Sequence, residues 1–265
     1  MYCASTPLLA LPQSERIICK LEGANPSGSL KDRAVFPMIA GEDSRLPLLT
    51  ADWGPFALST AWAGKLLGRQ VHCLLPEDAP AVFVEKIHAL GAQIHMERGS
   101  LQELRQRAAR AEDVQLLDSS CDPEYAMAFC EGLAEELWSQ CSGSIAALVC
   151  GTESCGCLMG CATGLKMKNP DIWAVAAPLS QDRYGSCDPL GTTDPEFYVP
   201  QLCDLLSYCS LQQARQQQKW FREQSGISCG IIGGAALQAA KDLEKELPPD
   251  KGSIVVILPS CYDCY

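Results

Sequence analysis

Positive charge is in short supply in this chain. Its 265 residues include 21 lysines and arginines against 32 aspartates and glutamates, and the net charge is −11. Residues of the two signs are interleaved along the sequence, with no basic cluster. Nucleic acids and anionic membranes both select proteins with a positive surface. The composition therefore predicts that neither is a partner.

Long apolar runs and histidine are also scarce. No run approaches the ~20 residues that a membrane-spanning helix needs. The N-terminus shows no basic segment followed by an apolar one, the pattern of a secretory signal. We therefore expect a cytoplasmic protein that is not embedded in a membrane. The three histidines, His72, His88 and His95, fall in segments typical of strand and helix surfaces, and we assign them no catalytic role.

Cysteine, by contrast, is abundant, with 16 residues. In a short secreted chain this number would indicate a disulfide framework, but this chain is long and has an ordinary apolar content. The default role of each cysteine is that of a small buried apolar residue. Cys261 and Cys264 have C-x-x-C spacing, which hints at redox chemistry or metal binding. Cys155, Cys157 and Cys161 could complete a metal set in space.

Strand-like and helix-like segments alternate along most of the chain. Such alternation indicates parallel βαβ units with right-handed crossovers. Residues 178–200, rich in proline and glycine, are expected to form a long irregular loop. The expected strands are 17–19, 47–50, 71–76, 92–96, 114–117, 145–150, 173–177 and 253–258, and the main expected helices are 56–67, 82–90, 101–111, 126–140 and 211–224.

One stretch, residues 21–33, joins an apolar run to a helix. Asn-Pro and Ser-Gly within it are turn-forming pairs. Ser29 is expected to cap a helix whose first turn carries Lys31, Asp32 and Arg33. A lysine fixed at a turn between a strand and a helix has room for a ligand beside it, although for an arbitrary lysine the common interpretation is a solvated surface residue.

The pattern K-L-E-x-x-N-P-S-G-S-L-K-D-R at residues 20–33 resembles the cofactor-lysine motif of the cysteine synthase / cystathionine beta-synthase family, a branch of the fold-type II pyridoxal-phosphate (PLP) enzymes. The resemblance extends from Thr6 to Ser260. It implies an α/β, tryptophan synthase beta-like fold of two three-layer αβα domains with PLP in the cleft between them. Lys31 would be the Schiff-base lysine and the general base, and the enzyme would be a homodimer.

The resemblance also implies a division of labour between the domains. Residues 1–145 would form the N-terminal domain, which carries Lys31 and the substrate loop, and its first strands can pack with the second domain. Residues 146–265 would form the C-terminal domain, which carries the phosphate loop. The apolar strand 145–150 opens into this loop, where an open α/β sheet binds ligands.

Several further residues align with the family's cofactor contacts. In the phosphate loop, Cys155 and Cys157 stand where the family usually has glycine and threonine, and a thiol is the poorer hydrogen-bond partner. Ser260 aligns with the serine that contacts the pyridine nitrogen, and Gly226 opens a G-I-S-C-G turn similar to the family's G-I-S-S-G. The resemblance thus implies cofactor contacts at Lys31, Trp53, Glu153, Ser154, Cys155, Gly156, Cys157, Gly226 and Ser260.

The substrate loop departs from the family pattern. Thr50, Ala51, Asp52 and Trp53 align with the start of T-S-G-N-T, which holds the substrate carboxylate and, through the asparagine, contacts the 3′-oxygen of PLP. Here Asp52 brings a negative charge that would repel a carboxylate, and Trp53 fills space. We expect these four residues to contact the substrate, with altered recognition of amino acids.

The activity implied by the resemblance is that of a PLP-dependent lyase or transferase. It would carry out β-elimination or β-replacement, through an aminoacrylate, on an amino acid such as O-acetylserine, O-phosphoserine or cysteine. The neutral Ser260 hydroxyl would not keep the ring nitrogen protonated, which suits this chemistry. One alternative is a catalytically degenerate paralogue that binds or regulates, favoured by Asp52 and Trp53 and opposed by Lys31 and Ser260. Another is a thiol-rich carrier of metal or sulfur.

Overall fold

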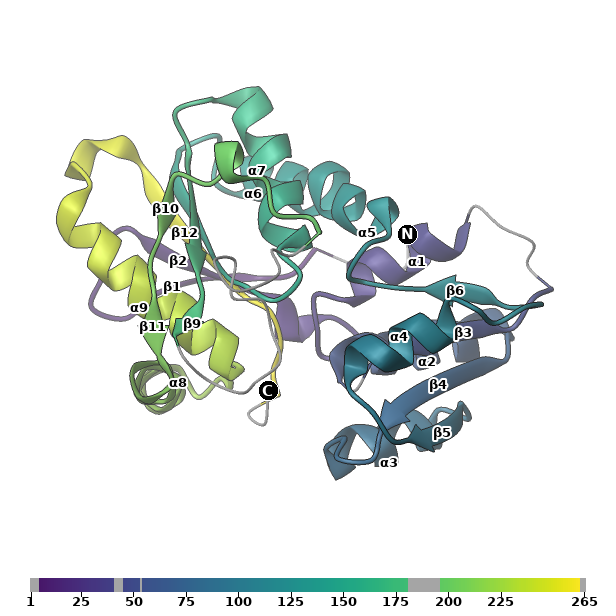
Figure 1. The fold of residues 1–265 in the computed structure, drawn as a ribbon. Helices are drawn as coiled ribbons and strands as arrows, with labels where there is room; N and C mark the ends of the chain where they lie inside the picture. The colour runs from purple at the N-terminus through teal and green to yellow at the C-terminus, as the bar shows by residue number, and fades with distance from the viewer. Residues whose placement is uncertain (1–4, 41–44, 53, 181–195, 263–265) are drawn as a thin grey trace.

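The computed structural model describes residues 5–40, 45–52, 54–180 and 196–262, and Figure 1 shows two sheets, each with helices packed on it. The larger sheet has six strands in the order β1-β2-β12-β7-β8-β10. Among its described strand pairs, only β1–β2 is antiparallel. β7, an apolar run, lies between β12 and β8. The strands are β1 (Leu8–Ala10), β2 (Ile17–Leu21), β12 (Ser253–Leu258), β7 (Ile145–Gly151), β8 (Trp173–Ala177) and β10 (Leu205–Leu206).

The smaller sheet has four parallel strands in the order β5-β4-β3-β6. One face is covered by α2 and α3, and the other by α4, whose Leu104 and Ala108 pack on Leu49 and Ala51. Its elements are β3 (Leu48–Ala51), α2 (Pro55–Leu67), β4 (Val71–Pro76), α3 (Ala81–Ala89), β5 (Gln93–Glu97), α4 (Leu101–Ala108) and β6 (Gln115–Leu117).

The six-stranded sheet is covered on both faces as well. α8 (Leu211–Ser225) and α9 (Ile231–Glu246) pack on one face. The other face carries α5 (Pro123–Ala128), the π-helical turn η2 (Phe129–Leu133), α6 (Ala134–Gln140) and α7 (Gly156–Lys168). The remaining elements are η1 (Glu22–Ala24), β9 (Leu179–Ser180), η3 (Pro200–Leu202), β11 (Cys209–Ser210) and η4 (Pro249–Lys251). The predicted α/β class, with helices on both faces of each sheet, is confirmed.

Helix α1 (Asp32–Ala40) lies between the two halves, packed against α2 and α5. It begins later than the sequence predicts, because the residues before it bond elsewhere. Ser29 forms a bridge with Ser260, and the Leu30 N–H donates to the Pro259 carbonyl at 2.8 Å. The Ser29 hydroxyl accepts from the Lys31 N–H at 3.2 Å. Lys31 therefore sits immediately before the helix, tied to the end of β12.

A buried ionic network fixes α1 against the six-stranded half. The Arg33 guanidinium donates to Glu22 at 2.6 Å and to Glu136 of α6 at 2.9 Å. Lys20 also donates to Glu136. Each buried charge thus has an opposite partner, which is the condition for keeping charges out of water. Lys20, Glu22 and Arg33 of the lysine motif thus help to position the helix.

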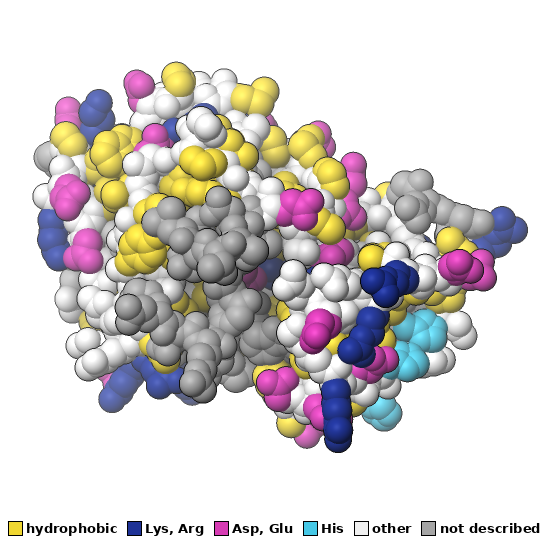
Figure 2. Space-filling model, viewed as in Figure 1, with side chains coloured by type: hydrophobic (Ala, Val, Ile, Leu, Met, Phe, Trp, Pro, Cys, Tyr) yellow, Lys and Arg dark blue, Asp and Glu magenta, His cyan; other side chains and the backbone are white. Residues whose placement is uncertain are grey.

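The surface agrees with the mixed charge pattern of the sequence. Figure 2 shows basic and acidic side chains interspersed on the visible face. Within the described part of the chain, no helix is long and apolar enough to span a bilayer. The first two strands, β1 and β2, join strands from the C-terminal part in the same sheet. The domain boundary between residues 145 and 146 stays a prediction.

Candidate functional site

The Lys31 side chain lies at the meeting point of three elements. Its Nζ donates to the Tyr125 hydroxyl of α5 at 2.8 Å and to Glu153 Oε2, in the loop after β7, at 2.8 Å. Lys31 is buried, with 7% of its surface exposed. It is therefore not the solvated surface lysine that its position before a helix would ordinarily suggest.

The charge on Lys31 is stabilised by its partners. Burial is the largest single effect and would lower the pKa of the ammonium, but the Glu153 carboxylate and the Tyr125 hydroxyl together outweigh it, and the pKa is raised. Burial raises the pKa of Tyr125 to about 12, so its hydroxyl stays protonated at neutral pH. The amine is thus held as a cation in a fixed place, between a carboxylate and a neutral hydroxyl.

A pocket opens beside this amine. Its wall includes Lys31, Tyr125 and the loop residues from Glu153 to Cys157, with Pro259 also in the lining. The structure therefore brings the predicted lysine and the predicted phosphate loop together around one space. The loop ends at the N-terminus of α7, where N–H groups that have no partner within the helix favour an anion.

The loop conformation accommodates the unusual residues. Cys155 has φ 61°, in the left-handed region where glycine is usually found. Gly156 has no room for a side chain, because a Cβ there would lie 2.6 Å from the Tyr125 ring. Cys157 follows as the second residue of α7.

Among the described side chains, three buried hydroxyls at strand ends lack hydrogen-bond partners. They belong to Ser260 after β12, Thr152 in the loop after β7 and Thr50 at the end of β3. Buried polar groups in folded proteins are nearly always paired, so such orphans require an explanation. Each of the three lies at the carboxyl end of a parallel strand, where α/β sheets bind ligands.

In the substrate loop, the carboxylate of Asp52 has partners that the sequence did not predict. Asp52 accepts a hydrogen bond from the Gly54 N–H at 2.9 Å, and its carboxylate lies 3.6 Å from Arg105 Nη2. Burial raises the pKa of Asp52, while Arg105 opposes that rise. The negative charge thus has a partner in α4, and the carboxylate helps to fold the loop. Thr50 and Ala51 are buried at the end of β3, and Trp53 lies outside the described residues.

Gly226 does not line the pocket beside Lys31. It ends α8 with φ 73°, a left-handed conformation that accounts for glycine at this position. The other end of this turn lies near the site, because the Gly230 N–H donates to the Ser260 carbonyl at 3.3 Å.

Three of the neighbouring residues have no signal in the sequence. Arg105 lies in a segment predicted only as a helix, and Tyr125 of α5 lies just before the predicted helix 126–140. Their roles depend on partners far away in the sequence. Thr152 precedes the predicted phosphate loop and was not singled out. Among the described residues, no group of three or more histidine, cysteine, aspartate or glutamate side chains is arranged to hold a metal ion.

Comparison with known proteins identifies relatives for the whole fold. The family model described as "Pyridoxal-phosphate dependent enzyme" matches residues 1–260. Cysteine synthase B of Pseudomonas aeruginosa is 27% identical, over 92% of this chain and 87% of its own. Cystathionine beta-synthase of Apis mellifera is 28% identical, over 96% of this chain and 57% of its own. A hydrogen sulfide-producing enzyme from Fusobacterium nucleatum superposes with a TM-score of 0.87 at 23% identity, covering 98% of this chain and 96% of its own.

The residues present fit PLP in most respects. Lys31 offers a primary amine, the orphaned Ser260 hydroxyl suits a ring nitrogen, and the loop before α7 offers N–H groups to a phosphate. Among the described residues, Glu153 fits poorly, since its carboxylate shares that loop and must part from Lys31 when the amine bonds to the cofactor. The family match covers nearly the whole chain and the resemblance to cysteine synthases is confirmed. The chain belongs to the pyridoxal-phosphate dependent enzymes.

Proposed function

We propose that this protein catalyses β-replacement or β-elimination on an amino acid with a leaving group on its β-carbon, such as O-acetylserine, O-phosphoserine or cysteine. The observation that carries the proposal is the Lys31 amine, which lies in a pocket formed with the loop before α7. The relatives support it, since two of them are named for making cysteine or cystathionine. When bound, PLP supplies a carbonyl that Lys31 can capture and an electron sink for negative charge at the substrate α-carbon.

In this proposal, Lys31 first holds the cofactor and then serves as the base that removes the α-proton. Tyr125 positions the amine, because its hydroxyl lies 2.8 Å from Nζ and the ring is fully buried. A base must stay within hydrogen-bond reach of the proton that it takes, and a fixed partner restricts its motion. Ser260 offers a neutral hydroxyl to the ring nitrogen. Ser154, Cys155, Gly156 and Cys157 contact the phosphate.

The substrate carboxylate would bind at the end of β3. Thr50 provides a buried hydroxyl without a partner among the described residues, and the N-terminal end of α2 provides backbone N–H groups. Arg105 supports this assignment by offsetting the charge of Asp52, which would otherwise repel a carboxylate. We further propose a cytoplasmic homodimer. The abundance of cysteine in a long chain supports a reducing compartment, and the dimer follows the family resemblance.

The experiment is a turnover assay on protein reconstituted with PLP. Each of the three amino acids is supplied with and without sulfide, and cysteine, pyruvate and ammonia are measured. We expect PLP-dependent turnover of at least one of them, lost in Lys31→Ala and kept in Lys219→Ala, which changes a lysine on the exposed face of α8. Absence of turnover with all three, in folded protein that binds PLP, would refute the proposal. Sedimentation analysis tests the dimer.

A further inference from the structure

The carboxyl end of the four-stranded sheet holds one arginine between two aspartates. Arg105 Nη2 lies 3.6 Å from the carboxylate of Asp52 after β3, and Arg105 Nε lies 3.7 Å from the carboxylate of Asp118 after β6. The Asp52 and Asp118 side chains are only 14% and 15% exposed. The Ser120 N–H and hydroxyl donate to Asp118 at 2.9 and 2.6 Å and hold it in place. One guanidinium is thus shared by two largely buried carboxylates, which together outnumber it in charge.

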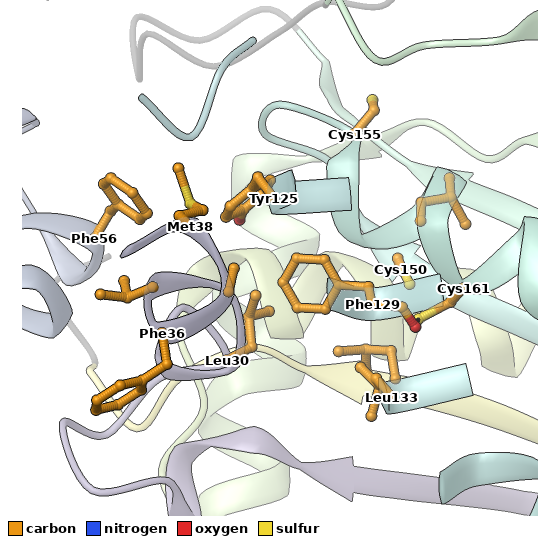
Figure 3. Packing of buried hydrophobic residues seen from close by; sticks show 14 of the residues in the cluster. Leu30, Phe36, Met38, Phe56, Tyr125, Phe129, Leu133, Cys150, Cys155 and Cys161 are labelled. Atoms are coloured by element: carbon orange, nitrogen blue, oxygen red, sulfur yellow. Dashed lines mark hydrogen bonds between the residues drawn. The ribbon is translucent and has the colours of Figure 1, made fainter. Parts of the chain in front are cut away.

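This cluster belongs to the same site as Lys31. Helix α2 begins soon after Asp52, and its Phe56 ring lies edge-on to the Tyr125 ring, with centroids 6.0 Å apart (Figure 3). The Tyr125 hydroxyl in turn lies 2.8 Å from Lys31 Nζ. Burial raises the pKa of Asp52, the Lys31 cation opposes that rise and the Glu153 carboxylate adds to it. Asp52 therefore lies within the electrostatic reach of the groups that line the pocket.

The charge balance of the site changes when the cofactor binds. Glu153 lies 2.8 Å from the Lys31 ammonium, and this pairing ends once the amine bonds to the cofactor. Glu153 then joins the two aspartates as a carboxylate without a cation of its own. The N–H groups at the start of α7 are those proposed above to hold the cofactor phosphate, so they do not remain free for another anion. A second phosphate in the loaded site would therefore meet carboxylates and the phosphate already there.

We propose that Asp52, Asp118 and Glu153 make this site select its substrate by charge: it takes amino acids with an uncharged group on the β-carbon and excludes those with an anionic group, such as O-phosphoserine. This inference rests on the proposed function and narrows it. All candidates share the same α-carboxylate and α-ammonium groups, so the free energy of binding these groups cancels when two candidates are compared. The buried Thr50 hydroxyl, which has no partner among the described residues, is available to that shared carboxylate.

The expected discrimination follows from the strength of such charge interactions. O-Phosphoserine adds close to two negative charges near neutral pH, whereas O-acetylserine adds none. A charge within ~4–6 Å shifts a pKa by about 1–3 units, equivalent to about 10- to 1,000-fold in a binding constant. Because solvent reaches each carboxylate in part, we expect a difference of about 100-fold. Serine O-sulfate has the shape of O-phosphoserine and one negative charge, so it separates the effect of charge from that of size.

The test measures dissociation constants for the three compounds with PLP-reconstituted protein, from the first change in visible absorbance after mixing. We expect affinity to fall by about tenfold at each step from O-acetylserine to serine O-sulfate to O-phosphoserine. Asp118→Asn keeps the acceptor for Ser120 and should tighten O-phosphoserine by about three- to tenfold, with O-acetylserine nearly unchanged. Asp113→Asn is the matched control, because it removes the same charge from an exposed residue at the opposite end of β6, where asparagine tolerates the φ of 56°.

Each outcome bears on the proposal. Equal or tighter binding of O-phosphoserine by the wild type would overturn it, and so would serine O-sulfate that binds as weakly as O-phosphoserine, since size alone would then explain the exclusion. An unchanged O-phosphoserine affinity in folded Asp118→Asn, or an equal gain in Asp113→Asn, would also overturn it.

Turnover of the three compounds is measured separately, so that the two proposals can fail independently. Binding in the expected order without turnover would refute the proposed function and leave selection by charge intact. Turnover that favours O-phosphoserine would refute selection by charge and leave the proposed function intact. Folded, PLP-loaded protein that binds none of the three would refute both.

Discussion

Replacing Glu153 with glutamine should speed the capture of PLP by Lys31. Only a neutral amine can attack the cofactor carbonyl, and the Glu153 carboxylate, 2.8 Å from Nζ, stabilises the charged form. Burial would lower the pKa of Lys31, but Glu153, with help from Tyr125, outweighs it and the pKa is raised. The substitution keeps the shape of the side chain and removes its charge. It should therefore increase the neutral fraction of Lys31 at a fixed pH.

The magnitude follows from the position of the pair. An opposite charge within ~4–6 Å shifts a pKa by about 1–3 units, and each unit changes the neutral fraction tenfold. Glu153 is 21% exposed, so solvent weakens the interaction. We therefore expect the lower end of the range, an increase of about tenfold in the capture rate.

The assay follows visible absorbance after stopped-flow mixing with PLP. Pyridoxal, which lacks the phosphate, is run beside it, because Glu153 would also repel a phosphate in the same loop. A gain with both compounds locates the effect at Lys31. Glu124→Gln is the matched control, since this exposed carboxylate precedes Tyr125 and lies outside the pocket. An unchanged or slower rate with pyridoxal in the Glu153→Gln variant would refute the reasoning.

Three further predictions concern stability and substrate binding. Hydrogen bonds from Arg33 and Lys20 lower the pKa of Glu136 to about 2, although burial opposes the shift. The ionised carboxylate therefore stabilises the fold fully above about pH 4.5, and this stabilisation is lost as pH falls towards 2. Glu136→Gln should remove about 2 kcal/mol of the pH dependence of the unfolding free energy, measured in urea, and an equal pH dependence in both proteins would contradict this. Gly160→Ala should cost about 1–3 kcal/mol, since its Cβ would lie 2.2 Å from a carbonyl oxygen, whereas Gly132→Ala meets nothing within 4 Å; equal unfolding midpoints would contradict this. Arg105→Gln should weaken amino-acid binding about tenfold in spectral titrations, and exposed Arg107→Gln should not; equal affinities would show that Arg105 has no such role.

The lysine motif allowed much of the fold to be predicted, because it joins local turn chemistry to a long and specific resemblance. The alternation of strands and helices indicated the correct α/β class, because hydrophobic periodicity is a local property of the sequence. The start of α1 was misplaced because Ser29 and Leu30 pair with residues at the end of β12, more than two hundred positions away. Local capping patterns cannot reveal that competition.

The structure brings Lys31 and the predicted phosphate loop together around one pocket, and the neighbours that the sequence did not predict share one property. Tyr125 contacts Lys31, and Arg105 pairs with Asp52, across long separations in the sequence. Asp52 was expected to repel a substrate carboxylate, because its partner Arg105 cannot be identified from the local sequence. Lys20 and Arg33 both donate to Glu136 of α6, which is also far away in the sequence. The structural role of these two charges therefore cannot be read from the motif alone.

The most direct test of the account is to locate the covalent link to the cofactor. The protein is incubated with PLP, reduced with borohydride and digested, and the modified peptide is identified by mass. We expect a phosphopyridoxyl group on the peptide that contains Lys31, absent from Lys31→Ala. A group found only on surface lysines, or none in folded protein, would contradict the central claim that Lys31 holds the cofactor.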